Sequence, residues 1–289
     1  METWFLFALG TAACIVLSDI AQKKALLEEH TLEMLAARGV FLVPLLIVMG
    51  FIVRTGVPAD AFPWLYLASV LTTVGIVFQV KGFRHLDLSV AAPLLNLNPL
   101  FLLLFGLLLL GERPGAFQLV GVLLIVAGTY LLERDPVYHG ILGPVKKLQH
   151  DKYGLSMVAA ALLFSLVQVL DKHIIGGGVN PLAYLFWVWL FINLNLALIH
   201  LAMFQWRELG ADIVRDWRWL GLASAALLLQ VSFYYAAVQR GPVTLIIPVT
   251  RVAALGLVLA GGNLFHEQNL RRRLAAAAIM VVGVFLILV

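Results

Sequence analysis

Arg251 is the residue whose position most needs a chemical explanation. It lies eight residues after Val243 in the apolar stretch 243–264, about 12 Å along a helix that rises about 1.5 Å per residue. A guanidinium buried in hydrocarbon costs about 2.5 kcal/mol or more, so we expect it to face a cavity or a partner. Its bidentate donors suit a carboxylate or phosphate, whereas hydrogen bonding to opened carbonyls, Tyr or Asn is the structural alternative.

Two asparagines and two prolines belong to the same chemical picture. Asn96 and Asn98 lie in another apolar stretch, 88–110, where they can bind a polar ligand or join helices. Pro93 precedes Asn96 by three residues, as Pro248 precedes the buried arginine. Because proline cannot donate to a helix ladder, we predict a kinked or locally open helix at both places.

Other polar and aromatic side chains lie within apolar stretches. They are candidates for the wall of the same cavity, and packing between helices is the alternative for each. This set comprises Gln79, Gln230, Tyr234, Tyr235, Gln168, Ser165 and Ser18.

Four acidic residues lie near the ends of apolar stretches. Asp19 could carry a coupling proton or pair with Lys23, four residues later. Asp171 comes shortly before three consecutive glycines, which predict a helix end with a possible gating role; we interpret Asp171 as an interfacial charge. Glu112 and Glu267 each precede a further apolar stretch, so we expect them to stabilise the positive end of the next helix.

Composition identifies the environment of these residues. Of the 289 residues, 62% are hydrophobic and 12% are charged, and the mean hydropathy is +0.97. Soluble domains average roughly 45–50% apolar and about 25% charged, so a water-soluble globule is excluded. We expect an integral membrane protein, and the net charge of +4 marks loops, not a nucleic-acid partner. Cys14 is the only cysteine, which excludes intramolecular disulfides.

The apolar stretches are too long for barrel strands and predict ten membrane-spanning α-helices. Their approximate ranges are 3–22, 34–53, 64–82, 88–110, 116–133, 154–174, 182–204, 219–239, 243–264 and 273–289. The polar stretch between the two groups of five predicts a first half at 1–133, a linker at 134–153 and a second half at 154–289. Part of the linker could lie along the membrane surface.

An internal repeat relates the two halves. Residues 64–131 align without a gap to residues 219–286 at a constant offset of 155. The alignment pairs Asn96 with Arg251, and its matched residues include Trp64 with Trp219, Pro93 with Pro248, Glu112 with Glu267, and Gly128 with Gly283. Because each half has an odd number of spans, the second must enter the membrane from the opposite face. The sequence therefore predicts an inverted repeat, typical of secondary transporters.

The segment 92–101, the run Gly111-Glu112-Arg113-Pro114, and the later Gly121 and Gly128 resemble a repeat of the drug/metabolite transporter superfamily, EamA type. Ser18 followed by Lys23 is similar to the opening helix of that family. The second half keeps Pro248, Glu267 and Gly283 but has His266 where Gly111 predicts glycine. The resemblance implies a central cavity lined by spans 1, 3, 4, 6, 8 and 9, and alternating access. It does not fix the substrate.

The charges leave two orientations open. Apart from Arg251, fifteen of the 20 Lys and Arg residues flank one face, and Arg54, Arg113, Lys172 and Arg240 flank the other. This bias favours termini outside the cell. The family resemblance favours termini inside.

These observations predict a secondary active transporter of a small organic solute in the plasma, or bacterial inner, membrane. An amino acid, organic acid or similar metabolite is the expected cargo, with a coupling proton or counter-substrate as a further partner. A non-transporting membrane subunit or a lipid flippase is the alternative. We expect no catalytic residues, cofactor, metal or nucleic-acid partner, because no motif for them is present. A homodimer is left open.

Overall fold

The computed structural model describes residues 2–25, 31–53, 56–86, 94–133, 152–203, 206–256 and 270–288, and these form helices without a β-strand. The elements are α1 (Thr3–Ala25), α2 (Thr31–Ile52), η1 (Ala59–Ala61), α3 (Phe62–His85), α5 (Asn98–Phe105), η2 (Gly106–Leu110), α6 (Ala116–Glu133), α8 (Lys152–Gly176), α9 (Pro181–Met203), α10 (Trp206–Arg240), α11 (Val243–Thr250) and α13 (Leu270–Leu288).

Apolar helices occur in all ten stretches that the sequence singles out. Within the described residues, five are long and apolar enough to cross a membrane: Thr3–Ala21, Ala59–Gly82, Lys152–Gly176, Pro181–Leu201 and Trp217–Arg240. Shorter apolar helices cover Ala37–Ile52, Asn98–Leu110, Ala116–Leu131, Val243–Gly256 and Ala275–Leu288. The predicted all-α membrane class is confirmed, and the count of ten spans stays a prediction.

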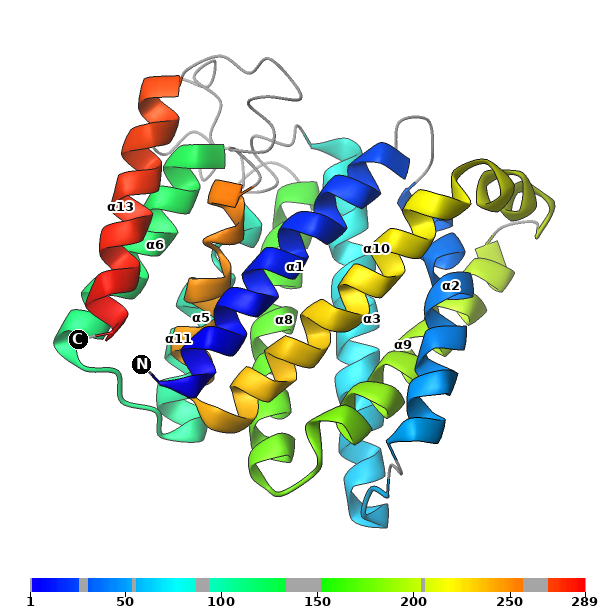
Figure 1. Ribbon diagram of the computed structural model, residues 1–289, viewed down its shortest axis with the longest axis horizontal. Coiled ribbons are helices and arrows are strands. Elements are labelled where there is room, and N and C mark those ends of the chain that lie inside the picture. The colour runs from blue at the N-terminus through cyan, green and yellow to red at the C-terminus, as the bar shows by residue number, and fades with distance from the viewer. Residues whose placement is uncertain are drawn as a thin grey trace.

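The pairs of helices that pack together can be compared with the predicted duplication. In Figure 1, α6 and α13 form one edge of the bundle, α2 and α9 lie at the opposite side, and α1 and α10 run across the front. The most extensive contacts join α1 with α10, α6 with α13, α3 with α8, α2 with α10, α2 with α9, α3 with α9, α5 with α8 and α1 with α11, and α5 also contacts α11. Exchanging each helix for its counterpart in the other half leaves this set unchanged, which supports a pseudo-twofold relation.

Glycines permit the closest of these pairings. A Cβ atom on Gly121 of α6 would lie 2.5 Å from the carbonyl oxygen of Gly283, and a Cβ on Gly283 would lie 2.7 Å from that of Gly121. Small residues allow helix backbones to approach in a membrane, where packing and not hydrophobic exclusion drives association. The α6–α13 pair therefore depends on both glycines.

Two corresponding turns occur in the helical path, and the second begins three residues after Pro248. The helical path turns at residues 96–97 and again at residues 251–252. In the first turn the Leu97 N–H donates to the Leu94 carbonyl at 3.2 Å, and in the second the Val252 N–H donates to the Val249 carbonyl at 3.1 Å. These bonds are related by the offset of 155 residues. After Pro248 the helix thus tightens into turns with i to i−3 hydrogen bonds, whereas Pro93 lies outside the described residues.

Turn residues set other helix ends. One π-helical turn, η2, ends at Gly111, whose φ of +67° suits glycine. Between α8 and α9, Gly178 has a φ of +99°. The Asn180 side chain then accepts the Leu182 N–H at 2.9 Å and caps α9, which starts with proline. The glycine run after Asp171 therefore ends a helix, as predicted.

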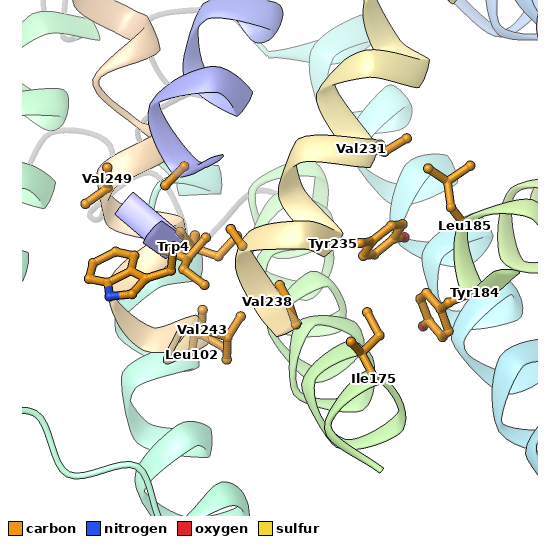
Figure 2. Packing of buried hydrophobic residues seen from close by; sticks show 14 of the residues in the cluster. Trp4, Leu102, Ile175, Tyr184, Leu185, Val231, Tyr235, Val238, Val243 and Val249 are labelled. Atoms are coloured by element: carbon orange, nitrogen blue, oxygen red, sulfur yellow. The ribbon is translucent and has the colours of Figure 1, made fainter. Parts of the chain in front are cut away.

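A continuous apolar core joins the helices. Figure 2 shows part of it, from Trp4 and Val249 on one side to Tyr184 and Leu185 on the other. Residues 134–151 of the predicted linker lie outside the described part, and α8 already begins at Lys152.

Candidate functional site

A cavity of about 310 Å³ lies among helices of both predicted halves. Its lining comes from α1, α3, α5, α8, α9, α10 and α11. The polar or aromatic lining residues are Thr11, Thr72, Gln79, Asn98, Phe164, Gln168, Asp171, Trp189, Gln230, Tyr234, Tyr235, Thr250 and Arg251. The cavity thus brings together most of the predicted site residues, and their role in binding stays a prediction.

Asn98 fastens the start of α5 to α8. The two hydrogens of its amide nitrogen are shared among three acceptors, the Ser165 hydroxyl at 2.9 Å, the Gln168 side-chain oxygen at 3.1 Å and the Ala161 carbonyl at 3.2 Å. The Ser165 hydroxyl donates back towards the Asn98 carbonyl at 3.0 Å. Asn98 is 1% exposed, so this network satisfies polar groups that water does not reach. Asn98 therefore joins two helices, which is one of the two roles that the sequence analysis left open for it.

Arg251 lies at the interruption after α11 and lines the same cavity. Its Nη2 group is 3.4 Å from the Asn98 side-chain oxygen, to which it donates. The backbone N–H of Arg251 donates to the Pro248 carbonyl at 3.0 Å, which belongs to a tight turn. A turn that departs from the α-helical bond pattern is tolerated at membrane depth where it lines a cavity, and Arg251 occupies such a place.

An acidic residue influences Arg251. Asp19 of α1 is partly buried and lies within electrostatic range of both Arg38 and Arg251. The sequence places Asp19 near a helix end, and the structure brings it within electrostatic range of Arg251. The two guanidiniums exceed the one carboxylate by a single positive charge, so Asp19 does not neutralise the group. Asp19 itself is not a lining residue, and the side chain of Lys23 lies outside the described part.

Asp171 also departs from its predicted position. It is 2% exposed and lines the cavity, so the interpretation as an interfacial charge was wrong. The Tyr184 hydroxyl donates to Oδ1 at 2.5 Å, and the Tyr234 hydroxyl donates to Oδ2 at 3.1 Å. The sequence misplaced Asp171 because the aromatic residues that bury it come from α9 and α10.

The remaining predicted residues lie elsewhere. Asn96 and Ser18 are buried but do not line the cavity, and Pro248 is buried within α11. Glu267 and His266 lie outside the described residues. The structure thus brings Gln79, Gln230, Tyr234, Tyr235 and Gln168 to the cavity with Asn98, Asp171 and Arg251, and it does not bring Asn96 or Ser18 there.

A larger hollow of about 710 Å³ lies at the bundle end that holds both termini. There the Glu112 carboxylate accepts the Val243 N–H at 3.0 Å, the Thr244 N–H at 3.1 Å and the Thr244 hydroxyl at 2.6 Å. Glu112 therefore caps α11, not the following helix α6, which corrects the predicted partner. We call these contacts of Glu112 with residues 243–244 the α11 clamp. The hollow is lined by helix ends, so the smaller cavity is the better candidate for a binding site.

Lys172 reinforces this end of the bundle. Its ammonium donates to the carbonyl oxygens of Val238 and Gly241, each at 2.8 Å, at the end of α10. A cation is favourable at a helix C-terminus, where carbonyls lack partners within the helix. Two consecutive residues of α8 thus have different roles: Asp171 lines the cavity, and Lys172 binds the C-terminus of α10.

Sequence reasoning missed several residues of the site. Trp189, Thr72 and Thr250 line the cavity, and Tyr184 orients Asp171 from behind it. Tyr184 had a detectable signal, because only a short turn separates α8 from α9 and Tyr184 follows Asp171 by 13 residues. The threonines had none, since a helical threonine usually bonds its own backbone, as Thr72 does to the Ala68 carbonyl at 2.7 Å.

Comparison with known proteins identifies the family. Two bacterial proteins, each named "Probable 4-amino-4-deoxy-L-arabinose-phosphoundecaprenol flippase subunit ArnE", are similar over 74 residues, which is 26% of this chain and 66% of theirs. The protein from Pectobacterium atrosepticum is 38% identical and the one from Photorhabdus laumondii subsp. laumondii is 32% identical. The match thus spans just under two thirds of these relatives.

A solved crystal structure has the same fold, with a TM-score of 0.75 over 98% of this chain and 96% of that one at 17% identity. The EamA-like transporter family matches residues 2–134 and again residues 152–289. This match agrees with the sequence analysis, which predicts a transporter and not an enzyme. The chain is therefore a multi-pass integral membrane protein that belongs to the EamA-like transporter family.

Proposed function

We propose that this chain is a secondary carrier that moves a small polar organic group through the membrane by alternating access. The observation that carries the proposal is the cavity of about 310 Å³, in which polar side chains from both halves converge inside an apolar bundle. Polar groups within a membrane bundle are costly unless they serve a pathway or a site. The two halves, 1–133 and 154–289, would rock around this level as inverted repeats.

Arg251 would bind an anionic group of the cargo. The Arg251 guanidinium, which lines the cavity, suits a carboxylate or phosphate because its paired donors match two oxygens of such a group. Asn98 holds one side of the guanidinium, which would restrict its rotation and present the remaining donors to a ligand. Gln79 and Gln230 would supply further donors and acceptors.

The relatives favour a second form of the same function. Their name describes a subunit of a flippase for an amino-sugar that is linked through phosphate to a lipid. Such a cargo also presents a phosphate to a membrane cavity, so Arg251 would serve it equally well. In this form the carrier would move a lipid-linked headgroup, would need a partner subunit, and would lie in the bacterial inner membrane. In the first form of the proposal, the cargo would be a soluble amino acid or organic acid.

Flux into sealed proteoliposomes tests the proposal. The purified chain should move a soluble anion or a labelled anionic lipid, and Arg251→Gln should lower the apparent affinity about tenfold or more, because a charge-assisted hydrogen bond contributes about 1.5–3 kcal/mol. Arg113→Gln, at an exposed position outside the cavity, is the matched control.

Full flux by Arg251→Gln would refute the role of the guanidinium. No flux of either cargo by the wild-type chain would favour the accessory-subunit alternative. Flux of the lipid alone would favour the lipid-linked form over the soluble one.

A further inference from the structure

Asp171 stands out because it places a carboxylate in the wall of the cavity. It belongs to α8, five residues before the helix ends at Gly176, and it is almost completely buried. Both of its oxygens accept hydroxyl hydrogens, from Tyr184 at 2.5 Å and from Tyr234 at 3.1 Å. These bonds fix the orientation of the carboxylate without supplying a positive charge.

The neighbouring cation does not compensate for Asp171. The ammonium of Lys172 is directed to the α10 terminus, where it bonds two carbonyl oxygens at 2.8 Å. In the part of the chain that the structure describes, no Lys, Arg or His forms an ion pair with Asp171. Buried charges in proteins are normally paired, so an unbalanced carboxylate in a cavity wall indicates that a positive group arrives with a ligand.

Aromatic rings surround the same carboxylate. The rings of Tyr234 and Tyr235 lie 5.0 Å apart, and those of Tyr184 and Tyr235 are also 5.0 Å apart and nearly perpendicular. Figure 2 shows Tyr235 of α10 next to Tyr184 of α9. Tyr234 and Tyr235 line the cavity, whereas Tyr184 is fully buried behind it. A carboxylate beside aromatic faces is a combination that attracts ammonium groups.

We propose that Asp171, with Tyr234 and Tyr235, forms a subsite for a primary ammonium group of the cargo. The proposal rests on the proposed function, because Arg251 supplies the complementary subsite for the anionic group in the same cavity. The cargo class is therefore an amphoteric headgroup or solute, which carries an ammonium at one end and a phosphate or carboxylate at the other. Tyr184 is a positioning residue that orients the carboxylate.

Two matched pairs of probes test this subsite with the purified chain in nanodiscs. The soluble pair is 2-aminoethyl phosphate and ethyl phosphate, and the lipid pair is dihexanoyl phosphatidylethanolamine and dihexanoyl phosphatidylethanol. Within each pair the molecules differ by one ammonium group. Titration calorimetry at neutral pH, where the amine is protonated, should give about tenfold or tighter binding of the aminated member. The pair that binds identifies a soluble or a lipid-linked source.

Variants locate the effect. Asp171→Asn should lower the affinity for the aminated probe to that of its partner and leave the amine-free probe unchanged. Asp60→Asn, at an exposed aspartate of η1, should keep the full preference. Tyr234→Phe keeps the ring and should retain part of the preference, and Tyr66→Phe, on an exposed face of α3, is its control.

Three results would overturn the subsite: equal binding of both members of each pair by the wild-type chain, an undiminished preference in Asp171→Asn, or loss of both probes in Asp171→Asn. Equal binding would leave a bound proton as the explanation of Asp171. Failure of the wild-type chain to bind any of the four probes would instead contradict the anion site at Arg251, and would thus be distinguishable as a failure of the proposed function.

Discussion

The α11 clamp is a direct test of alternating access, because it joins the two predicted halves. Glu112 belongs to the first half, and the three groups that it binds belong to Val243 and Thr244 of the second. If this end of the bundle opens during transport, these hydrogen bonds must break in each cycle. We predict that Glu112→Ala shifts the carrier towards the state that is open at this end.

The magnitude follows from the three contacts. Loss of an N-cap side chain costs about 1 kcal/mol, and loss of a negative charge at a helix N-terminus costs about 0.3–1 kcal/mol. The Thr244 hydroxyl bond to a charged group contributes about 1.5–3 kcal/mol. Val243 and Thr244 are fully buried while the Glu112 side chain is in place, so these hydrogen bonds are shielded from water in the closed state of the wild-type chain. The closed state should thus lose about 3–5 kcal/mol, which is a shift of about 100-fold or more in the closed-to-open ratio.

Cysteine labelling measures this shift. In a Cys14→Ser background, which is free of cysteine, single cysteines at Leu102 and Leu245 place one reporter on each half. Both positions are at most 2% exposed, on the packed helices α5 and α11. A water-soluble thiol reagent should react about 10–100-fold faster at both positions in Glu112→Ala, by the same conversion of free energy to population.

Matched variants separate gating from other effects. Glu112→Gln keeps one acceptor oxygen and should give an intermediate rate, and Arg113→Ala, at the exposed neighbour, should change neither rate. Unchanged labelling at both cysteines in a folded Glu112→Ala protein would refute the reasoning. Faster labelling at Leu245 alone would indicate fraying of α11 and would also contradict a clamp between halves.

Two further substitutions test the site and the bundle. Asn98→Asp places a carboxylate where the amide oxygen now lies 3.4 Å from Arg251, so we expect loss of binding to ethyl phosphate, measured by calorimetry; retained affinity would contradict the anion site. Gly283→Leu forces α6 and α13 apart, because its Cβ would lie 2.7 Å from the Gly121 carbonyl oxygen. Overpacking costs about 1–3 kcal/mol, so the thermal midpoint should fall, while Val282→Leu on the exposed face should leave it unchanged.

The sequence predicted those features that depend on local composition. Apolar length located the helices, and proline with a polar residue three positions later located the interruption at Arg251. It also offered Gln79, Gln168 and Gln230 as candidates for the cavity wall, where the structure places them, and their role in binding stays a prediction. Each of these signals lies within one helix and is readable without knowledge of its neighbours.

The errors concern partners that are distant in the chain. Glu112 was assigned to the next helix, but its carboxylate caps α11, more than a hundred residues later. Asp171 was assigned to the interface because it lies near a helix end, but Tyr234 and Tyr184 bury it from two other helices. The distance of a residue from the end of its helix does not tell whether its side chain is exposed to solvent. In an interior helix, the residues packed around it decide exposure.

The interruptions and the cavity residues coincide for a physical reason. A backbone turn in hydrocarbon exposes carbonyl and N–H groups that must be satisfied within the protein or by water in a cavity. Proline at position 248 denies the Thr244 carbonyl its usual helical donor, and Arg251 follows one helical turn later. The turn therefore lies in a polar zone in which a guanidinium costs less than in lipid, and the guanidinium donates there to the Asn98 side-chain oxygen. Asn98, beside the corresponding break in the first half, donates to α8 and accepts from Arg251, so the two breaks share one hydrogen-bond network. A carrier with this arrangement can exchange these internal bonds for bonds to a charged cargo at little net cost, because neither state leaves the polar groups in contact with lipid.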